Sequence, residues 1–430
     1  ITWTTNLVLD ANSRISLSNN DNGAYNTIFG SNTGGSSINS GAGFNVIIGD
    51  GAANDGAKTS AFDHNTIVGY SAGEDTTTAA NNTLIGSLSG ETLLTGTDNV
   101  CIGYRAMWDL DAGTTAQGSS SNVIIGSSAG SGAWANQNNS NLVIIGSGAC
   151  VGAMEGDTTD GTLAIGTSAL AALTSGVGNV AVGHEALLSE DTGDGNTAVG
   201  YRALKLCNGA NDNGNTAVGY TALSNLTGGI KNTAMGYQAG LNIIGGTNNT
   251  AVGYNALYTE DEGDYNTAIG DYALYLQNVG SGAGNNVGIG RNAGYNNVTG
   301  TDNTYVGTSA GTGGTGNNSN NVGVGSGALL AVTTGSANVA IGKQSMAAET
   351  DGLNNVAIGL GSLQALTSSS QNVAIGSGAM ESMDDTADGL ANCVAIGYQA
   401  FAGSATATTT GANGTVAVGK YALTALTTGA

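Results

Sequence analysis

The sequence contains no proline, although average usage would give a chain of 430 residues roughly 20 of them. Proline lacks a backbone N–H and interrupts the hydrogen-bond ladder of a sheet, so its absence is typical of a chain that is laddered along its whole length. The 73 glycines suggest disorder instead. Disordered chains, however, are poor in β-branched residues, whereas this chain spaces them regularly. We therefore expect an ordered β protein.

Charged residues are few, at 9%, and basic ones are the fewest. Nine Lys and Arg stand against 31 Asp and Glu, which gives a formal net charge of −22. A chain this acidic is repelled by a phosphate backbone, so nucleic acid is excluded as a partner. No apolar run approaches the 18 or so residues that a membrane span requires, and no membrane insertion by this segment is expected.

The four cysteines are Cys101, Cys150, Cys207 and Cys393, and none belongs to a CxxC pair. They fall in different repeats, too far apart along a stack to form disulfides. Cys101 stands where other repeats have Ile or Ala, so we interpret it as a small buried hydrophobe. The chain begins with Ile rather than Met and without a signal-like segment, and we expect it to be a fragment or processed piece of a longer protein.

What the sequence does contain is one motif, repeated about 22 times, of which Asn249–Leu257 (Asn-Thr-Ala-Val-Gly-Tyr-Asn-Ala-Leu) is a clear copy. Eleven of the 21 steps between successive central glycines are 17 residues, and the others reach at most 23. Extra residues enter between motifs and almost never within them, as in a solenoid. The prediction is an all-β, parallel β-solenoid of about 22 coils with a 17-residue basic repeat.

Each motif position has an expected structural role. Thr250 and Val252 alternate with Ala251, so they share one face of a strand and form a β-branched stripe. Asn249 is expected to make a turn, because its side chain can bond to the backbone and it tolerates a left-handed conformation. Ala256 is expected to face inward on a second, shorter strand. The residues assigned to the structural motif are Asn196, Gly200, Asn249, Thr250, Val252, Gly253, Ala256, Asn355, Val356, Ile358 and Gly359.

Three segments are predicted along the chain. Residues 1–25 do not follow the repeat and are expected to form an N-terminal cap or a joint. Residues 26–150 form coils with a bulky residue two before the central glycine, such as Ile47 and Ile144. Residues 151–430 continue the same solenoid with Ala or Gly at that position, Tyr305 being the main exception.

A single 17-residue coil offers few large apolar side chains. Residues 249–265 contain only Val252, Leu257 and a few tyrosines. The β-branched stripe must therefore be buried against something outside its own coil. A closed homo-oligomer, in which identical stripes meet on a shared axis, is the economical solution.

Three later motifs read Asn-Val-Ala-Ile-Gly, at residues 338–342, 355–359 and 372–376. They resemble the YadA-like head repeats of trimeric autotransporter adhesins, and the resemblance covers about 400 of the 430 residues. It implies a left-handed parallel β-roll and a homotrimeric rod, with Val356 and Ile358, like Thr250 and Val252, at the trimer axis.

The coils of this chain are longer than in that family, and Asn usually stands one residue nearer the glycine. In both respects the chain looks more like the repeats in fibre proteins of phages, where a self-cleaving chaperone often follows. The resemblance implies a structural fibre shaft and attachment protein on the virion surface, extracellular, with its own copies and a host-surface glycan or receptor as partners. The alternative is the passenger head of a bacterial trimeric surface adhesin, on the bacterial outer surface.

An enzyme, such as a polysaccharide-degrading tailspike, is disfavoured. Glycoside hydrolysis needs two carboxylates held close together on a rigid surface, and strand positions carry almost none. His64 and His184 stand alone in unrelated coils, without the partners of a metal site or a catalytic triad. No catalytic, cofactor-binding or metal-binding residue is therefore assigned.

Acidic clusters occur in three loops and raise the possibility of Ca²⁺ binding, since that ion prefers hard oxygen ligands. None matches an EF-hand loop or the glycine-rich Ca²⁺ nonapeptide, and solvated loop charge is the favoured interpretation. The clusters are Glu190, Asp191 and Asp194; Glu260, Asp261, Glu262 and Asp264; and Glu381, Asp384, Asp385 and Asp388.

Tyrosine follows the central glycine in four consecutive coils, at Tyr201, Tyr220, Tyr237 and Tyr254. The favoured interpretation is a ladder of stacked rings that stabilises the stack of coils. The alternative is a glycan-contact strip, because exposed aromatic faces suit pyranose rings.

Overall fold

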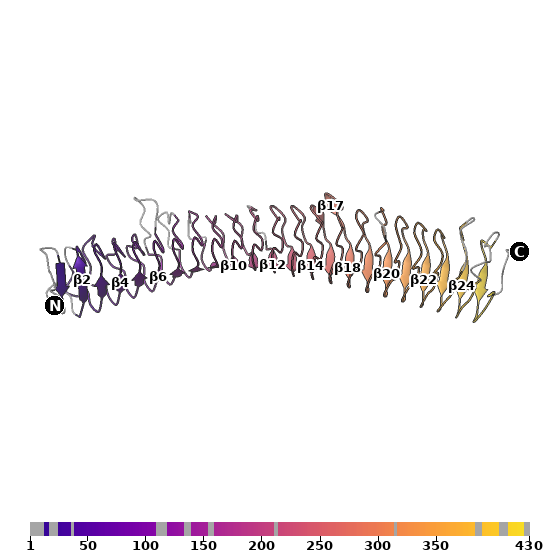
Figure 1. The fold of residues 1–430 in the computed structure, drawn as a ribbon, viewed down its shortest axis with the longest axis horizontal. Helices are drawn as coiled ribbons and strands as arrows, with labels where there is room; N and C mark the ends of the chain where they lie inside the picture. The colour runs from indigo at the N-terminus through magenta and orange to yellow at the C-terminus, as the bar shows by residue number, and fades with distance from the viewer. Residues whose placement is uncertain are drawn as a thin grey trace, which may run out of the picture. The chain divides into compact units, whose positions relative to one another are not determined.

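The structure is a computed structural model that describes residues 13–16, 25–35, 38–108, 118–132, 139–153, 159–209, 214–313, 316–382, 389–403 and 412–424. These residues form strands and turns, with no helix among them. The strands build a parallel β-solenoid of about 20 turns with a repeat of about 17 residues, which confirms the predicted all-β solenoid (Figure 1). In the part of the chain that is described, nothing forms a helix long and apolar enough to cross a membrane.

The chain divides into two compact units, residues 1–214 and 215–430. In the first unit β1 pairs antiparallel with β2, and every later strand pairs parallel with the one before it. Its strands are β1 (Ser13–Ser16), β2 (Thr27–Ser31), β3 (Val46–Ile48), β4 (Thr66–Val68), β5 (Thr83–Ile85), β6 (Val100–Ile102), β7 (Val123–Ile125), β8 (Val143–Ile145), β9 (Leu163–Ile165), β10 (Val180–Val182) and β11 (Thr197–Val199).

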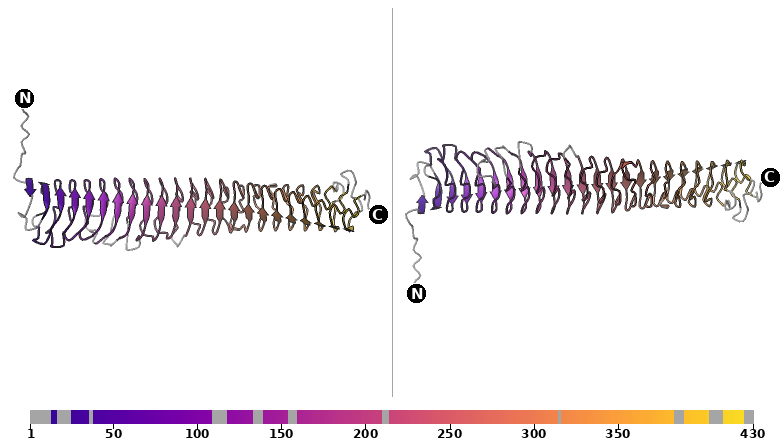
Figure 2. Two further views of the ribbon diagram at one scale, coloured as in Figure 1. Left: turned by 90° about the horizontal axis from the view of Figure 1, so that it is seen from below. Right: turned by 90° about the horizontal axis from the view of Figure 1, so that it is seen from above.

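The second unit continues the pattern with parallel pairing in chain order, and a separate two-stranded ladder joins β15 to β17. Figure 2 shows the strands of each unit side by side. They are β12 (Thr216–Val218), β13 (Thr233–Met235), β14 (Thr250–Val252), β15 (Gly263–Asp264), β16 (Thr267–Ile269), β17 (Gly282–Ala283), β18 (Val287–Ile289), β19 (Thr304–Val306), β20 (Val322–Val324), β21 (Val339–Ile341), β22 (Val356–Ile358), β23 (Val373–Ile375), β24 (Val394–Ile396) and β25 (Val416–Val418).

The motif strands stack in register, so that each position forms its own row. Thr250 pairs with Thr267, and Val252 with Ile269. In each three-residue strand the middle residue is buried while the two outer ones are half-buried or exposed. The predicted alternation is therefore confirmed: the middle residue points into the coil, and the β-branched stripe lies on its outside.

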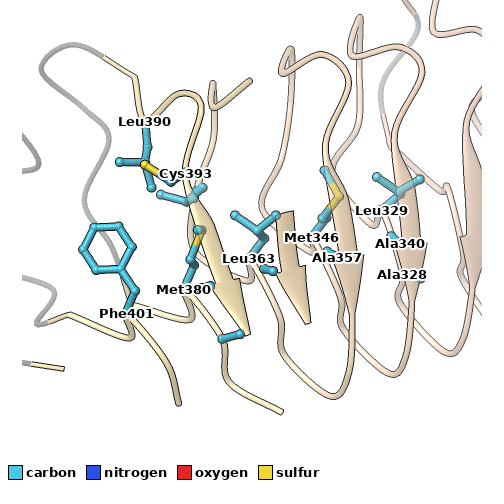
Figure 3. Close-up of a cluster of buried hydrophobic side chains, with 14 of the residues drawn as sticks. Ala328, Leu329, Ala340, Met346, Ala357, Leu363, Met380, Leu390, Cys393 and Phe401 are labelled. Carbon is cyan, nitrogen blue, oxygen red and sulfur yellow. The ribbon is translucent and has the colours of Figure 1, made fainter. Parts of the chain in front are cut away.

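Behind the middle residues of the motif strands, the interior of the second unit is thin and apolar. Leu329, Met346 and Leu363, each four residues after a central glycine, lie one above another in successive coils (Figure 3). Ala340 and Ala357 face them from the strands, and all five are fully buried. Small residues opposite one large residue per coil leave room for a single layer of side chains.

Tyr305 is the large exception in this layer, and its neighbours explain how it fits. It is fully buried at the middle of β19. The residues in register with it are Gly288 on β18 and Gly323 on β20, both without a side chain. The ring lies where side chains on Gly294, Gly311 and Gly323 would stand, because a Cβ added to any of these glycines would come within 3.2 Å of it.

The predicted second strand around Ala256 is wrong, although Ala256 itself is buried as expected. Asn255 and Leu257 have φ values of 52° and 50°, in the left-handed region, and residues 254–257 form turns. A chain that alternates between left-handed and other conformations cannot extend as a strand. This turn directs both Ala256 and Leu257 into the interior.

The residue two before the central glycine is buried on both sides of the predicted change from bulky to small side chains. Ile47 and Ile144 in the first unit are fully buried, and so is Ala164, which follows the predicted change. The segment boundaries at residues 25 and 150 stay predictions. Most of the predicted cap lies outside the described residues. Its described part includes β1, which pairs with the edge of β2.

Candidate functional site

The candidate interaction surface is the outer face of the sheet, formed by the first and third residues of each motif strand. We call it the outer stripe. Thr250, Val252 and Val356 are half-buried, whereas Ile358 is 36% exposed. In the described motif strands no residue at either outward position carries a charge. A sheet face this apolar is typical of a surface that is covered in the assembled protein.

A buried asparagine ladder holds the coils together behind this face. Asn249 accepts on its Oδ1 the backbone N–H of Asn266 at 2.9 Å, and its own N–H donates to Asn232 Oδ1 at 2.9 Å. Its Nδ2 donates to the carbonyl of Gly263 at 2.7 Å. Each such asparagine therefore ties two neighbouring coils and its own loop together. Asn355 does the same with Asn338, Asn372 and Ser369, and Asn196 bonds to Asn179.

The predicted turn at this asparagine is displaced by one residue. Asn248, not Asn249, has the left-handed φ of 55°. Asn249 is 1% exposed, so its side chain is an interior hydrogen-bonding group rather than a surface turn former. Sequence alone could not separate these roles, because asparagine suits both.

Replacing Asn249 with alanine is expected to destabilise the second unit by about 2–4 kcal/mol. The change leaves the backbone N–H of Asn266 and the carbonyl of Gly263 buried without a partner. Thermal unfolding of the full chain measures it. Asn248→Ala, at an exposed position, is the control for side-chain removal in the same turn. Equal losses in both variants would contradict the ladder's role.

The tyrosine ladder is confirmed in the second unit. The Tyr220 and Tyr237 ring centroids are 5.2 Å apart and those of Tyr237 and Tyr254 are 5.1 Å apart, with planes within 7° of parallel. Tyr272 lies with its edge against Tyr254 and also contacts Tyr275 and Tyr295. A second row, Tyr258, Tyr275 and Tyr295, runs beside it. Sequence reasoning missed this second row, because its members lie five residues after the glycine rather than one.

The geometry favours a stabilising ladder over a glycan strip. Stacked rings cover one another's faces and present only edges and hydroxyls to solvent. Pyranose rings contact aromatic faces, which the Tyr237 ring does not offer. These tyrosines are nevertheless between 42% and 46% exposed, so polar contacts with a partner remain open to their hydroxyls.

Tyr237→Ala is expected to lower stability by about 1–2 kcal/mol, because it removes the central ring of two stacked pairs. The melting temperature of the full chain measures the effect. The matched control is Tyr70→Ala, since Tyr70 also follows a central glycine but makes no ring contact within the described chain. An unchanged melting temperature together with lost glycan binding would instead support the strip.

In the first unit Tyr201 lies in a small charged cluster. It stacks on His184 at 5.3 Å, and the Arg202 guanidinium lies 4.9 Å from its ring centroid. Arg202 and Lys205 both contact Glu185, at 2.7 and 2.9 Å, and these two hydrogen bonds lower the pKa of Glu185 to about 2. His184 is thus part of an aromatic stack, as is His64, which stacks on Phe44 at 4.9 Å.

In two of the acidic loops one glutamate is not the solvated charge that was predicted. Glu190 and Glu260 are completely buried, and their carboxyls accept the backbone N–H groups of Gly193 and Gly263. Backbone amides of the loop thus bond one oxygen of each carboxyl inside the coil. Asp191, Asp261 and Asp264 are half-buried, Glu262 is exposed, and Asp194 accepts the N–H of Val177. Asp384, Asp385 and Asp388 lie outside the described residues.

Among the described residues, no three His, Cys, Asp or Glu side chains are grouped so that they could hold a metal ion. All four cysteines are buried, and burial raises the pKa of Cys101 and Cys150 to about 12, so these two are unreactive at neutral pH. Ca²⁺ binding at the acidic loops stays the alternative that the sequence left open.

The surface that the geometry singles out is therefore the outer stripe, flanked in the second unit by the tyrosine rows. Comparison with known proteins adds no relative: no family model, no curated protein and no solved structure matches the chain.

Proposed function

We propose that the chain is the shaft of a homotrimeric attachment fibre on a virion. Three copies wind as left-handed β-rolls with their outer stripes turned toward a common axis. The fibre is extracellular, performs no catalysis, and carries or forms the element that binds a host-surface glycan or receptor. The resemblance to fibre and adhesin head repeats supports the trimer and its handedness.

The observation that carries this proposal is the uncharged, partly exposed sheet face. Ile341, Ile358, Ile375 and Ile396 are each between 36% and 39% exposed and form a row along one unit. Burying such a row contributes about 25 cal/mol for every Å² removed from water. The thin coil leaves no space to fold the row inward, so other copies of the chain are the available cover.

Antibodies raised against the purified chain test the biological setting. Gold-labelled antibody is expected to mark fibres that project from virions in the sample that provides the gene. Labelling of a bacterial cell surface without virions would overturn the virion assignment and favour a surface adhesin.

A further inference from the structure

Three coils place a glutamate at an interior position that other coils fill with a hydrophobic residue. The position lies seven residues after the central glycine, where Leu226 and Ile243 are fully buried. Glu190, Glu260 and Glu349 occupy it, and each is 0% exposed. A carboxyl group in such a place needs partners for both oxygens, or else a proton.

The three carboxyls accept the same kind of hydrogen bond on Oε1 and differ in the partner of Oε2. Each accepts on Oε1 the backbone N–H of the glycine three residues on, at 2.7 to 2.9 Å. On Oε2, Glu190 accepts Asn196 Nδ2 at 3.3 Å and Glu349 accepts Ser369 Oγ at 2.8 Å. Glu260 accepts the N–H of Asp261 as well, at 3.2 Å, but on the same Oε1, and its buried Oε2 has no hydrogen-bond partner within the described chain.

A longer loop accounts for this difference. Asn266 stands six residues after Glu260, as Asn196 does after Glu190, yet its Nδ2 is also buried without a partner. In regular coils this nitrogen donates to the carbonyl 14 residues on, as Asn249 does to Gly263. The step from Gly270 to Gly290 is 20 residues rather than 17. The carbonyl 14 residues after Asn266 therefore lies in a longer loop. The next ladder bond, from Asn286 N to Asn266 Oδ1, lengthens to 3.2 Å.

We propose that protonation of Glu260 keeps its coil in the second unit closed. Its carboxyl carries a proton while the coil is closed. Ionisation places a charge on an oxygen without a donor and opens the coil locally, together with the loop that holds Tyr258 against Tyr275. Glu190 and Glu349, with both oxygens bonded, have no such function.

Among the described residues, none of the groups that shift the pKa of Glu260 is a cation. Burial is the largest cause that raises its pKa to about 7, and the charge of Asp261 adds to it, whereas the backbone amides of Gly263, Val279 and Asp261 oppose this rise without offsetting it. Glu262 and Asp264 on the same loop are also acidic. At the equivalent position the preceding coil has Ile243 and the following coil has Gln277, neither of which is charged.

The direction of the pH effect follows from this raised pKa. The closed coil binds the Glu260 proton more tightly than the open one, so the group's stabilisation is complete below about pH 4.5 and is lost as pH rises through about 7. Between pH 5.5 and 8.5 the local opening equilibrium is expected to rise roughly thirtyfold by proton linkage.

Hydrogen exchange of the full chain at pH 5.5 and 8.5, corrected for intrinsic exchange rates, tests this role of Glu260. Peptides from residues 253–286 are expected to lose at least about tenfold protection at the higher pH, and peptides around Glu349 are expected to change little. Glu260→Gln should remove the pH dependence of residues 253–286, because the amide cannot ionise. Glu190→Gln should leave it intact.

Two results would overturn the proposal. One is wild-type protection of residues 253–286 that is equal at both pH values. The other is a Glu260→Gln variant that keeps the wild-type pH dependence. The wild-type comparison stands by itself if the variant does not fold.

Discussion

Replacing Ile341, Ile358 and Ile375 together with glutamate is expected to convert the proposed trimer into monomers. All three belong to the outer stripe and lie in adjacent coils of the second unit. In a trimer the change would place nine carboxylates near one axis without counter-ions, and each buried unpaired charge costs several kcal/mol. The dissociation constant should rise by at least about a thousandfold. Sedimentation velocity across a dilution series measures this.

Leu360→Glu provides the matched control. Leu360 is 54% exposed and follows the same strand, but lies beyond the central glycine and off the stripe. It should leave the particle mass unchanged. If the triple variant also kept the wild-type mass, the outer stripe could not be the contact between copies.

Gly253→Ala is expected to destabilise the second unit by about 3 kcal/mol or more. Gly253 has a φ of 139°, a conformation that L residues rarely adopt. An added Cβ would lie 2.6 Å from the backbone carbon and oxygen of Gly270 in the next coil. Neither backbone atom can move without breaking the ladder. The melting temperature of the full chain should therefore fall by several degrees.

Gly178→Ala separates steric conflict from backbone conformation. Gly178 also has a positive φ, of 70°, but nothing lies within 4 Å of an added Cβ. The cost there should be only about 1 kcal/mol, from the left-handed conformation alone. If Gly253→Ala cost no more than this control, close approach between coils would not be the reason for the repeated glycine.

The solenoid itself could be predicted from sequence because its signal is repeated. Motif spacing fixes the stacking, and the alternation of Thr250, Ala251 and Val252 fixes which side chains point inward. Because every coil repeats the same pattern of residues, the pattern can be recognised even where a single motif departs from it. Ala256 was correctly placed inside for the same reason.

The errors concern single positions whose role depends on hydrogen bonding in three dimensions. Asn249 could serve a turn or an interior ladder, and only the neighbouring coil decides between them. Glu260 looked like loop charge, because the amides that draw it inward belong to a fold not visible in the sequence. The turn at Leu257 uses a left-handed conformation that leucine rarely adopts.

The mass of the native particle tests the central claim most directly. Sedimentation equilibrium or native mass spectrometry of the purified chain in dilute buffer is expected to give three times the chain mass of 42.0 kDa. A folded particle with the mass of one chain would contradict the proposal that the outer stripe is buried between copies.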